Sequence, residues 1–306
     1  MIFPEALATP VGALGLLLLG VSWLLDKKSY SKHIAAVGWV MTGLFFFDDA
    51  QYYIEHSDPV LTTMTSLALP ASLGFAYWEF QARDDKSETL KWFRGAMAFA
   101  GIPYLAVAHI PYLSVAGIEF VASHTAWMLS FSGIDAVTLG DTVINTPSGP
   151  ILWENYEGSK WFWANPYGEY PIQTRMMWSD GTYTGINIVL ACTALQSMIV
   201  FIGAISVLNI DAKRKMRALI LTIPTIHILN IFRNAGIIYL YDAFPDWQWL
   251  GVRMFDFAHT YAARVVSLFA MFLMATIMFQ MLPEFHKHIL NLLEPLTKIT
   301  RKAKSA

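Results

Sequence analysis

The sequence predicts an all-α polytopic membrane protein, a bundle of about seven or eight transmembrane helices with one long extracytoplasmic loop. Three observations predict this class. Of the 306 residues, 55% are hydrophobic and only 14% are charged, whereas soluble domains carry roughly a quarter charged residues. The apolar residues gather into runs long enough to cross a bilayer. The basic residues gather in alternate segments between these runs.

Seven apolar runs are predicted as membrane spans. They cover residues 8–25, 34–50, 60–79, 95–115, 184–208, 218–241 and 260–282. At about 20 residues each, they use roughly 140 residues and leave room for one long loop. We therefore expect a single integral membrane domain over residues 1–306. The first run has Glu5 and no basic residue before it, which favours a retained helix over a cleaved signal peptide.

Positive charges predict the orientation, because loops rich in Lys and Arg stay in the cytoplasm. Basic clusters follow the first, third, fifth and seventh runs: Lys27, Lys28 and Lys32; Arg83, Lys86, Lys91 and Arg94; Lys213, Arg214, Lys215 and Arg217; Lys287, Lys298, Arg301, Lys302 and Lys304. The loop at 48–58 is acidic instead. The N-terminus is therefore expected outside the cell membrane, and the C-terminus inside with a basic tail at 284–306.

Residues 112–131 are apolar enough to be considered as an eighth span. An additional crossing there would put the cluster Lys213–Arg217 outside, against the charge rule. This stretch is therefore predicted as an interfacial or re-entrant helix.

The long loop, residues 132–183, then lies outside. Its first half, from Val137 to Glu154, mixes β-forming residues with a Pro- and Gly-containing turn and predicts a β-hairpin. Its second half is rich in aromatic residues, among them Trp161, Trp163 and Trp178. Two interpretations remain open for these side chains: an aromatic belt at the membrane interface, or a platform that binds an extended peptide or a lipid headgroup.

Ionisable groups inside spans are costly and are candidate functional residues. Arg233 lies about eight residues, or roughly 12 Å, below the outer end of the sixth predicted span. Asn230 and Asn234 lie close to its face, with His227 one turn further in. A guanidinium cannot escape by deprotonation, so Arg233 is expected to face a wet cavity or an anion, or else to bind backbone carbonyls.

The single cysteine of the chain, Cys192, is predicted at the same depth in the neighbouring span, with Gln196 four residues further on the same face. A lone cysteine is most often a packing residue. The equal depth of a thiol and an arginine favours chemistry instead, because a nearby cation lowers the pKa of a thiol and fixed donors stabilise an oxyanion. A third group follows at the outer start of the last span, where His259 or Arg264 could serve.

These residues resemble the exosortase/archaeosortase family of membrane transpeptidases. The resemblance rests on three motifs: Ala191-Cys192-Thr193, Asn230-Ile231-Phe232-Arg233-Asn234, and a histidine or arginine in the last span. The spacing and the long outer loop are most similar to the archaeosortase branch. The motifs cover residues 180–270, and the rest of the chain is similar only in topology.

The resemblance implies a cysteine protease and transpeptidase without a cofactor or metal. Its implied partners are secreted proteins with a C-terminal tripartite sorting signal, namely a Pro-Gly-Phe-type motif, a transmembrane helix and a basic cluster. The enzyme would remove the tail through an acyl-thioester on Cys192 and transfer the new C-terminus to a membrane lipid. Arg233 would act as proton donor or oxyanion stabiliser, Arg264 as transition-state stabiliser and His259 as an alternative base. Asn230, Asn234, Gln196, Trp161, Trp163 and Trp178 are the expected substrate-binding residues.

The alternative from another class is a transporter or proton-coupled carrier that uses Arg233, His227 and Asn230 as an intramembrane site.

Several other classes of protein are excluded by missing motifs. The only cysteine permits no disulfide within the chain, and no His-Glu-x-x-His or Gly-x-Ser-x-Gly motif is present. A net charge of −2 gives no basic footprint for nucleic acid. The sequence leaves the oligomeric state open.

Overall fold

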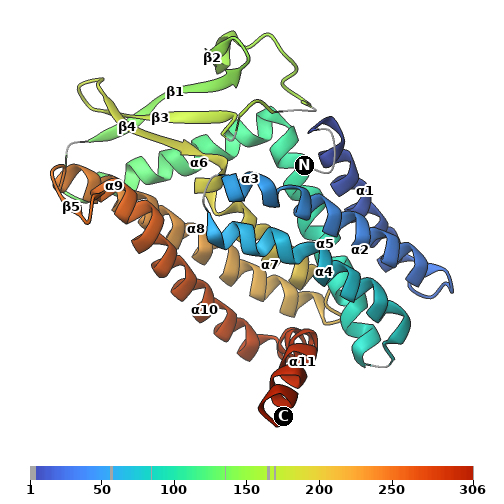
Figure 1. Ribbon diagram of the computed structural model, residues 1–306. Helices are drawn as coiled ribbons and strands as arrows, with labels where there is room; N and C mark the ends of the chain where they lie inside the picture. Colours follow the sequence, from blue (N-terminus) through green and yellow to red (C-terminus); the bar gives the residue numbers. More distant parts are fainter. Residues whose placement is uncertain are drawn as a thin grey trace. The chain divides into compact units, whose positions relative to one another are not determined.

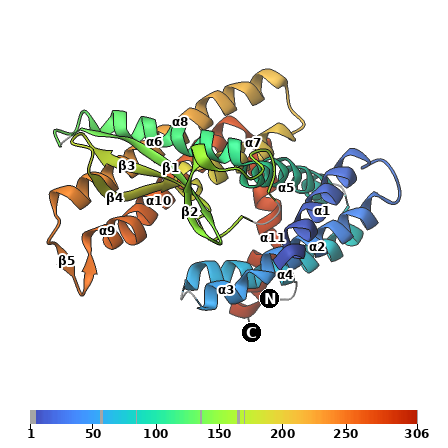
Figure 2. The same ribbon diagram turned by 90° about the horizontal axis from the view of Figure 1, so that it is seen from above.

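The structure is a computed structural model that describes residues 5–55, 58–83, 85–134, 136–163, 166–168 and 170–305. Within these ranges, side chains are described between residues 7 and 294. The chain divides into two compact units. Figures 1 and 2 show its helices and strands from two directions. Unit 1 comprises Met1–Leu105, Ile199–Leu219 and Met278–Ala306, and unit 2 comprises Ala106–Met198 and Ile220–Ile277.

All secondary-structure elements among the described residues of unit 1 are helices. Its elements are α1 (Glu5–Leu24), α2 (Ser31–Asp48), α3 (Ala50–Glu55), α4 (Pro59–Gln81), most of α5 (Asp85–His109), most of α7 (Leu195–Ser206), the start of α8 (Ala212–Ala243), the end of α10 (Ala263–Met281) and α11 (Pro283–Ser305).

Helix α2 packs against both α1 and α4 (Figure 1). Small residues allow this close approach: a Cβ at Gly43 would lie 2.5 Å from the Cβ of Ser72. Trp39 fills the core of unit 1 and stacks on Phe93 with ring centroids 5.0 Å apart. Since lipid is as apolar as a buried leucine, such tight packing rather than hydrophobicity is what holds membrane helices together.

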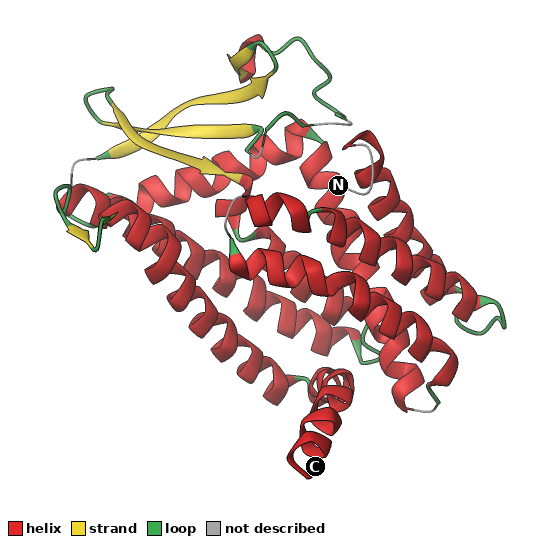
Figure 3. Cartoon of the chain, in the orientation of Figure 1, coloured by secondary structure: helices red, strands yellow, loops and turns green. Residues whose placement is uncertain are grey.

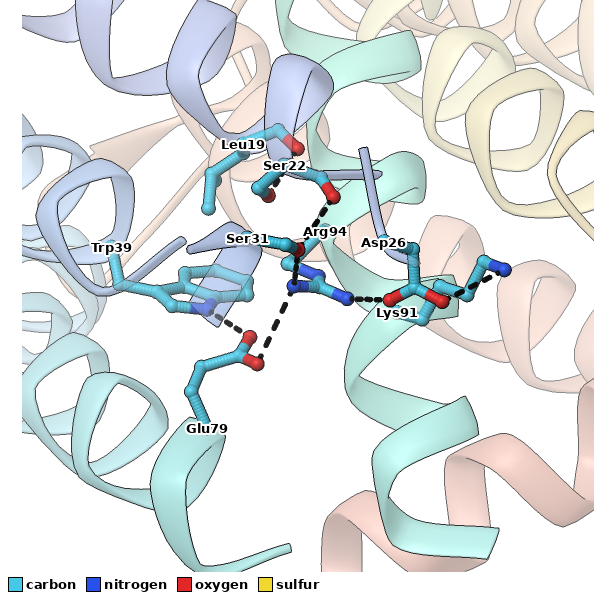
Figure 4. A network of polar contacts seen from close by, with 8 residues as sticks. All are labelled: Leu19, Ser22, Asp26, Ser31, Trp39, Glu79, Lys91 and Arg94. Carbon is cyan, nitrogen blue, oxygen red and sulfur yellow. Dashed lines mark hydrogen bonds and ion pairs between the residues drawn. The ribbon is translucent and has the colours of Figure 1, made fainter. Parts of the chain in front are cut away.

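A buried ion network also connects the helices of unit 1 (Figure 4). The Nη2 of Arg94 on α5 lies 2.6 Å from a carboxylate oxygen of Asp26, and its Nη1 lies 3.5 Å from one of Glu79 on α4. Trp39 on α2 donates its indole N–H to the other oxygen of Glu79 at 3.0 Å. Arg94 was predicted to be one of the basic loop residues that set the orientation. The structure buries it instead, with 2% of the residue exposed.

Unit 2 combines a small sheet with helices (Figure 3, strands in yellow). Its elements are α6 (Pro111–Leu129), β1 (Val137–Thr146), β2 (Gly149–Leu152), the 3-10 turn η1 (Trp153–Asn155), β3 (Ile172–Trp178), β4 (Tyr183–Val189), the 3-10 turn η2 (Leu190–Thr193), most of α8, the short strands β5 (Gln248–Trp249) and β6 (Val252–Arg253), α9 (Met254–Asp256), the π-helical turn η3 (Phe257–Ala262) and most of α10.

The four-stranded sheet has the order β2-β1-β3-β4, and all its neighbouring strands are antiparallel. Buried residues of β1, β3 and β4 pack against α6 and form the core of unit 2, including Ile172, Met176, Ile186 and Ile188. From α6, Ile118 and neighbouring apolar residues pack against them. The predicted hairpin at residues 137–154 is confirmed as β1 and β2.

Four helical segments among the described residues are each long and apolar enough to cross a membrane: Leu7–Leu24, Pro59–Gln81, Ala212–Ala243 and Met254–Met281. The number is five if α5 and α6 together form one bent span. These segments support a multi-pass membrane protein, while the count of seven stays a prediction. A helix over 112–131 is confirmed as α6, which meets these criteria only together with α5.

The predicted helical span over 184–208 is wrong in its first half. Residues Tyr183–Val189 form β4, and α7 contains only 12 residues. In β4 the buried Thr184, Ile186 and Ile188 alternate with more exposed residues, and β-branched residues with a period of two favour a strand. A sum of hydropathy over this stretch conceals the alternation, which explains the error.

Candidate active site

Cys192 lies on a tight turn between a strand and a helix in unit 2. Strand β4 ends at Val189, η2 contains Cys192, and α7 begins at Leu195. Ala194 connects them with a φ of 54°, in the left-handed region that non-glycine residues rarely adopt. The Thr193 hydroxyl donates to the carbonyl of Leu190 at 2.7 Å. The turn therefore places a half-buried thiol directly after the end of β4.

Two asparagines of α8 hold this turn in place. Asn230 and Asn234 donate their side-chain amides to the backbone carbonyl of Cys192, at 2.7 and 3.0 Å. Both asparagines are buried, and their spacing of four residues puts them on one face of the helix. Because these donors are used on the protein itself, they position Cys192. The predicted role of both residues in substrate binding stays a prediction.

Arg233 lies between these asparagines in sequence and contributes the charge of the site. It donates to the side-chain oxygen of Asn234 at 3.1 Å and is close enough to Cys192 to interact with it electrostatically. Within the described part of the chain, no carboxylate forms an ion pair with Arg233. The structure thus brings the predicted thiol and arginine together, with an uncompensated cation beside the thiol.

The third predicted group comes from the segment that leads into α10. His259 lies on the π-helical turn η3, and its ring stacks on Phe255 with centroids 5.6 Å apart. His259 interacts electrostatically with both Arg233 and Arg264. In an α-helix, five residues separate two side chains by about 140°, whereas the i→i+5 bonding of a π turn brings them closer to one face. His259 therefore lies near Arg233, and Arg264 lies near His259.

A cavity of about 330 Å³ adjoins this cluster within unit 2. Its walls are mostly apolar and come from α8, η3 and α10, with Ala194 from the Cys192 turn. Asn230 and Arg233 supply polar groups to its lining. An apolar cavity with a few polar groups is the usual form of a site that excludes water around a ligand.

The remaining predicted residues lie elsewhere in unit 2. Gln196 is exposed on α7, and Cys192 lies outside that helix, so the helical spacing that paired them does not apply. Trp163 and Trp178 pack against the core beneath the sheet, and Trp161 is 74% exposed with its ring 4.9 Å from that of Tyr112. Their roles in substrate binding stay predictions.

His227, which the carrier hypothesis requires beside Arg233, has other neighbours. Its ring stacks on Phe120 at 5.1 Å and meets the ring of His124 edge-on at 5.2 Å. His227 does not line the cavity that contains Arg233. The arrangement therefore gives no support to a joined arginine and histidine translocation site. Among the described residues, no group of three or more metal-binding side chains is present.

Comparisons with known proteins agree with the motifs. The family model described as "Transmembrane exosortase (Exosortase_EpsH)" matches residues 168–276, which contain β3, β4, Cys192, Arg233, His259 and Arg264. Archaeosortase A of Haloferax volcanii is 25% identical over 220 residues, covering 69% of this chain and 63% of that protein. Archaeosortase A of Natronomonas pharaonis is 27% identical over 213 residues, covering 69% of this chain and 59% of that protein.

These matches confirm the predicted resemblance to the exosortase/archaeosortase family and to archaeosortase A in particular. The chain spans less than two thirds of the length of the two relatives, 63% and 59%. No solved structure matches.

Proposed function

We propose that this multi-pass membrane protein, similar to exosortases and archaeosortases, is a cysteine transpeptidase that removes C-terminal sorting signals from surface proteins. The observation that carries this proposal is the pairing of a thiol, on a turn held by two asparagines, with an arginine that lacks a carboxylate partner among the described residues. The substrates would end in a Pro-Gly-Phe-type tripartite tail. We place the site near the outer face of the cell membrane, with the N-terminus outside and the C-terminus in the cytoplasm.

The first step would be acylation of Cys192. The thiol gives its proton to His259, and the thiolate attacks the scissile carbonyl to form a tetrahedral oxyanion. Arg233 stabilises this oxyanion and stays protonated throughout, because its pKa is too high for it to act as a general acid. When the C–N bond breaks, the imidazolium returns the proton to the leaving amine. A thioester then joins Cys192 to the surface protein.

The second step would transfer the acyl group to a membrane lipid. A nucleophilic hydroxyl or amine of the lipid attacks the thioester carbonyl, loses its proton to His259, and displaces the Cys192 thiolate, which takes up that proton. Arg264 would support the same oxyanion in both steps. The apolar walls of the adjoining cavity limit water access, which favours transfer over hydrolysis.

The experiment is tail removal in cells that lack the native enzyme, measured as a gel shift of a tailed surface protein. Cys192→Ala and Cys192→Ser are expected to yield no processed product at wild-type levels of inserted enzyme. Ser130→Ala, which changes an exposed hydroxyl at the end of α6, serves as a matched control and should process normally. Full processing by either Cys192 variant would exclude the thiol mechanism.

A further inference from the structure

The outer face of the sheet, on the side away from α6, is polar. In β3 and β4 the residues that alternate with the core positions include Gln173, Arg175, Met177, Tyr183 and Asn187. They line a hollow of about 460 Å³, together with residues of β1 and β2 that include Asn145. We call this the outer-face hollow. None of the sequence motifs considered above accounts for it.

An ordered chain of hydrogen bonds fixes the side chains of this hollow. The Tyr183 hydroxyl donates to the side-chain oxygen of Asn187 at 2.9 Å, and the Asn187 amide donates to that of Gln173 at 2.7 Å. Gln173 and Asn145 both donate to the backbone carbonyl of Tyr170, at 3.2 and 2.9 Å. These polar groups are satisfied by one another, so the hollow keeps its shape without a ligand.

Arg175 is the exception within this set. It lies directly opposite Asn187 in the pairing of β3 with β4 and is half-buried. Among the described residues it has no ion pair and no side-chain hydrogen bond, although five N–H groups are available on a guanidinium. A planar guanidinium matches a carboxylate with two parallel hydrogen bonds. The hollow therefore offers one anion-binding group on a preformed polar surface.

The position of Arg175 relative to Cys192 follows from chain connectivity. Its partner Asn187 precedes Cys192 by five residues, and β4 runs from Asn187 into the Cys192 turn. At about 3.3 Å per residue, this distance is at most roughly 16 Å. A substrate held with its scissile bond at Cys192 and its preceding residues extended along β4 would place its fifth residue upstream near Arg175.

We propose that the outer-face hollow binds the carboxylate of an acidic substrate residue about five positions before the scissile bond, with Arg175 as the specificity-determining residue. This inference rests on the proposed function. In the proposed orientation, both β4 and the substrate run from outside towards the membrane, so the residues before the scissile bond lie along the residues before Cys192. A single guanidinium surrounded by amides suits a monovalent carboxylate.

The test uses substrates that carry one Asp at successive positions, three to seven residues before the scissile bond, in an otherwise uncharged stretch. The wild type should show its lowest KM with Asp near the fifth position, and the matching Asn substrate should have a KM about tenfold higher. Arg175→Gln should remove this difference by raising only the KM for the Asp substrate, with kcat unchanged. Arg175→Glu should prefer a Lys substrate at the same position.

The matched control is Arg253→Gln, which removes the same charge from a side chain that is 81% exposed, and it should keep the Asp preference. Equal effects of Arg175→Gln on Asp and Asn substrates would overturn the proposal. The assay is repeated in lipid vesicles with increasing anionic lipid, and again with added inorganic phosphate. The proposal would also be overturned if the effect of Arg175→Gln changed with either addition, because Arg175 would then bind a lipid headgroup or a free anion. Failure of the proposed function is a separate outcome, because the wild type would then cleave neither the Asp nor the Asn substrates, or Cys192→Ser would cleave both as fast as the wild type.

Discussion

Arg94 of unit 1 and Arg233 of unit 2 both lie inside helices of an apolar chain, but their surroundings differ. Arg94 is buried against the carboxylates of Asp26 and Glu79. Arg233 contacts an amide oxygen of Asn234 and has, in the described part of the chain, no carboxylate partner. A charge that is already compensated holds helices together, whereas an uncompensated charge beside a thiol is available to a developing oxyanion. Position in a span alone does not distinguish these two roles.

The largest effect is expected from Arg94→Leu, because it leaves the buried carboxylate of Glu79 without its cation. Breaking a buried pair in this way costs roughly 3–5 kcal/mol, so the purified variant should melt well below the wild type in detergent. Adding Glu79→Gln should recover part of the loss, since it removes the uncompensated charge. A wild-type melting temperature for Arg94→Leu would show that the network carries no stability.

Arg233→Lys should reduce activity and leave stability unchanged, the opposite of what is expected for Arg94→Leu. Processing should fall by about 10²–10³-fold, because an ammonium cannot reproduce the paired donors that a guanidinium offers to an oxyanion. The melting temperature should stay near that of the wild type, since no buried carboxylate is left behind. Tail-removal rates and melting curves of the same preparation measure both quantities. Near-normal processing by the lysine variant would mean that the charge alone is required.

His259→Ala and Arg264→Ala should have different effects, because His259 is proposed as the base and Arg264 as a stabiliser of the transition state. Removal of a base lowers the thiolate fraction of Cys192, so His259→Ala should slow alkylation at neutral pH and move the pH optimum of processing upward. Arg264→Ala should slow processing by roughly tenfold to a hundredfold and leave alkylation largely unchanged. Because Cys192 is the only cysteine, alkylation reports on it alone. Unchanged behaviour of both variants would remove the third group from the mechanism.

The smallest effect is expected for the ion pair of Arg214 with Glu284, whose side chains are 40% and 41% exposed. Two hydrogen bonds of 2.7 and 2.8 Å from Arg214 lower the pKa of Glu284 below its ordinary value of 4.5. Glu284→Gln should cost less than about 1 kcal/mol, because water screens the pair. The stabilisation is complete above the ordinary pKa and is lost as the pH falls through the lowered one. Melting curves of both proteins should therefore converge in acid.

Much of unit 2 could be predicted from sequence. The hairpin followed from β-forming residues around a turn. The proximity of Cys192 and Arg233 followed from their equal predicted depth in neighbouring spans, although Cys192 lies on a 3-10 turn and not in a helix. Strand β4 was missed because its glycine and β-branched residues add up to an apolar run. The signal that identifies it, alternation with a period of two from Thr184 to Ile188, was present in the sequence.

The Arg94 network and the outer-face hollow could not be predicted in the same way. Arg94 and Asp26 lie near the ends of apolar runs, where charged residues are usually solvated, and only packing of α5 against its neighbours distinguishes a buried pair from a loop charge. Arg175 and Asn187 belong to none of the motifs, and their juxtaposition depends on the register of β3 with β4. This register follows from which face of each strand is buried, and that requires knowing that both strands pack against α6.

Covalent acylation of Cys192 is the central claim, and intact-mass spectrometry tests it most directly. The purified enzyme is mixed with a tailed substrate in detergent without an acceptor lipid, so that the thioester accumulates. The expected result is an enzyme mass increased by that of the substrate portion before the cleavage point, mapped to the peptide containing Cys192 and released by neutral hydroxylamine. Tail removal at the wild-type rate by Cys192→Ala, with no such adduct on the wild type, would contradict it.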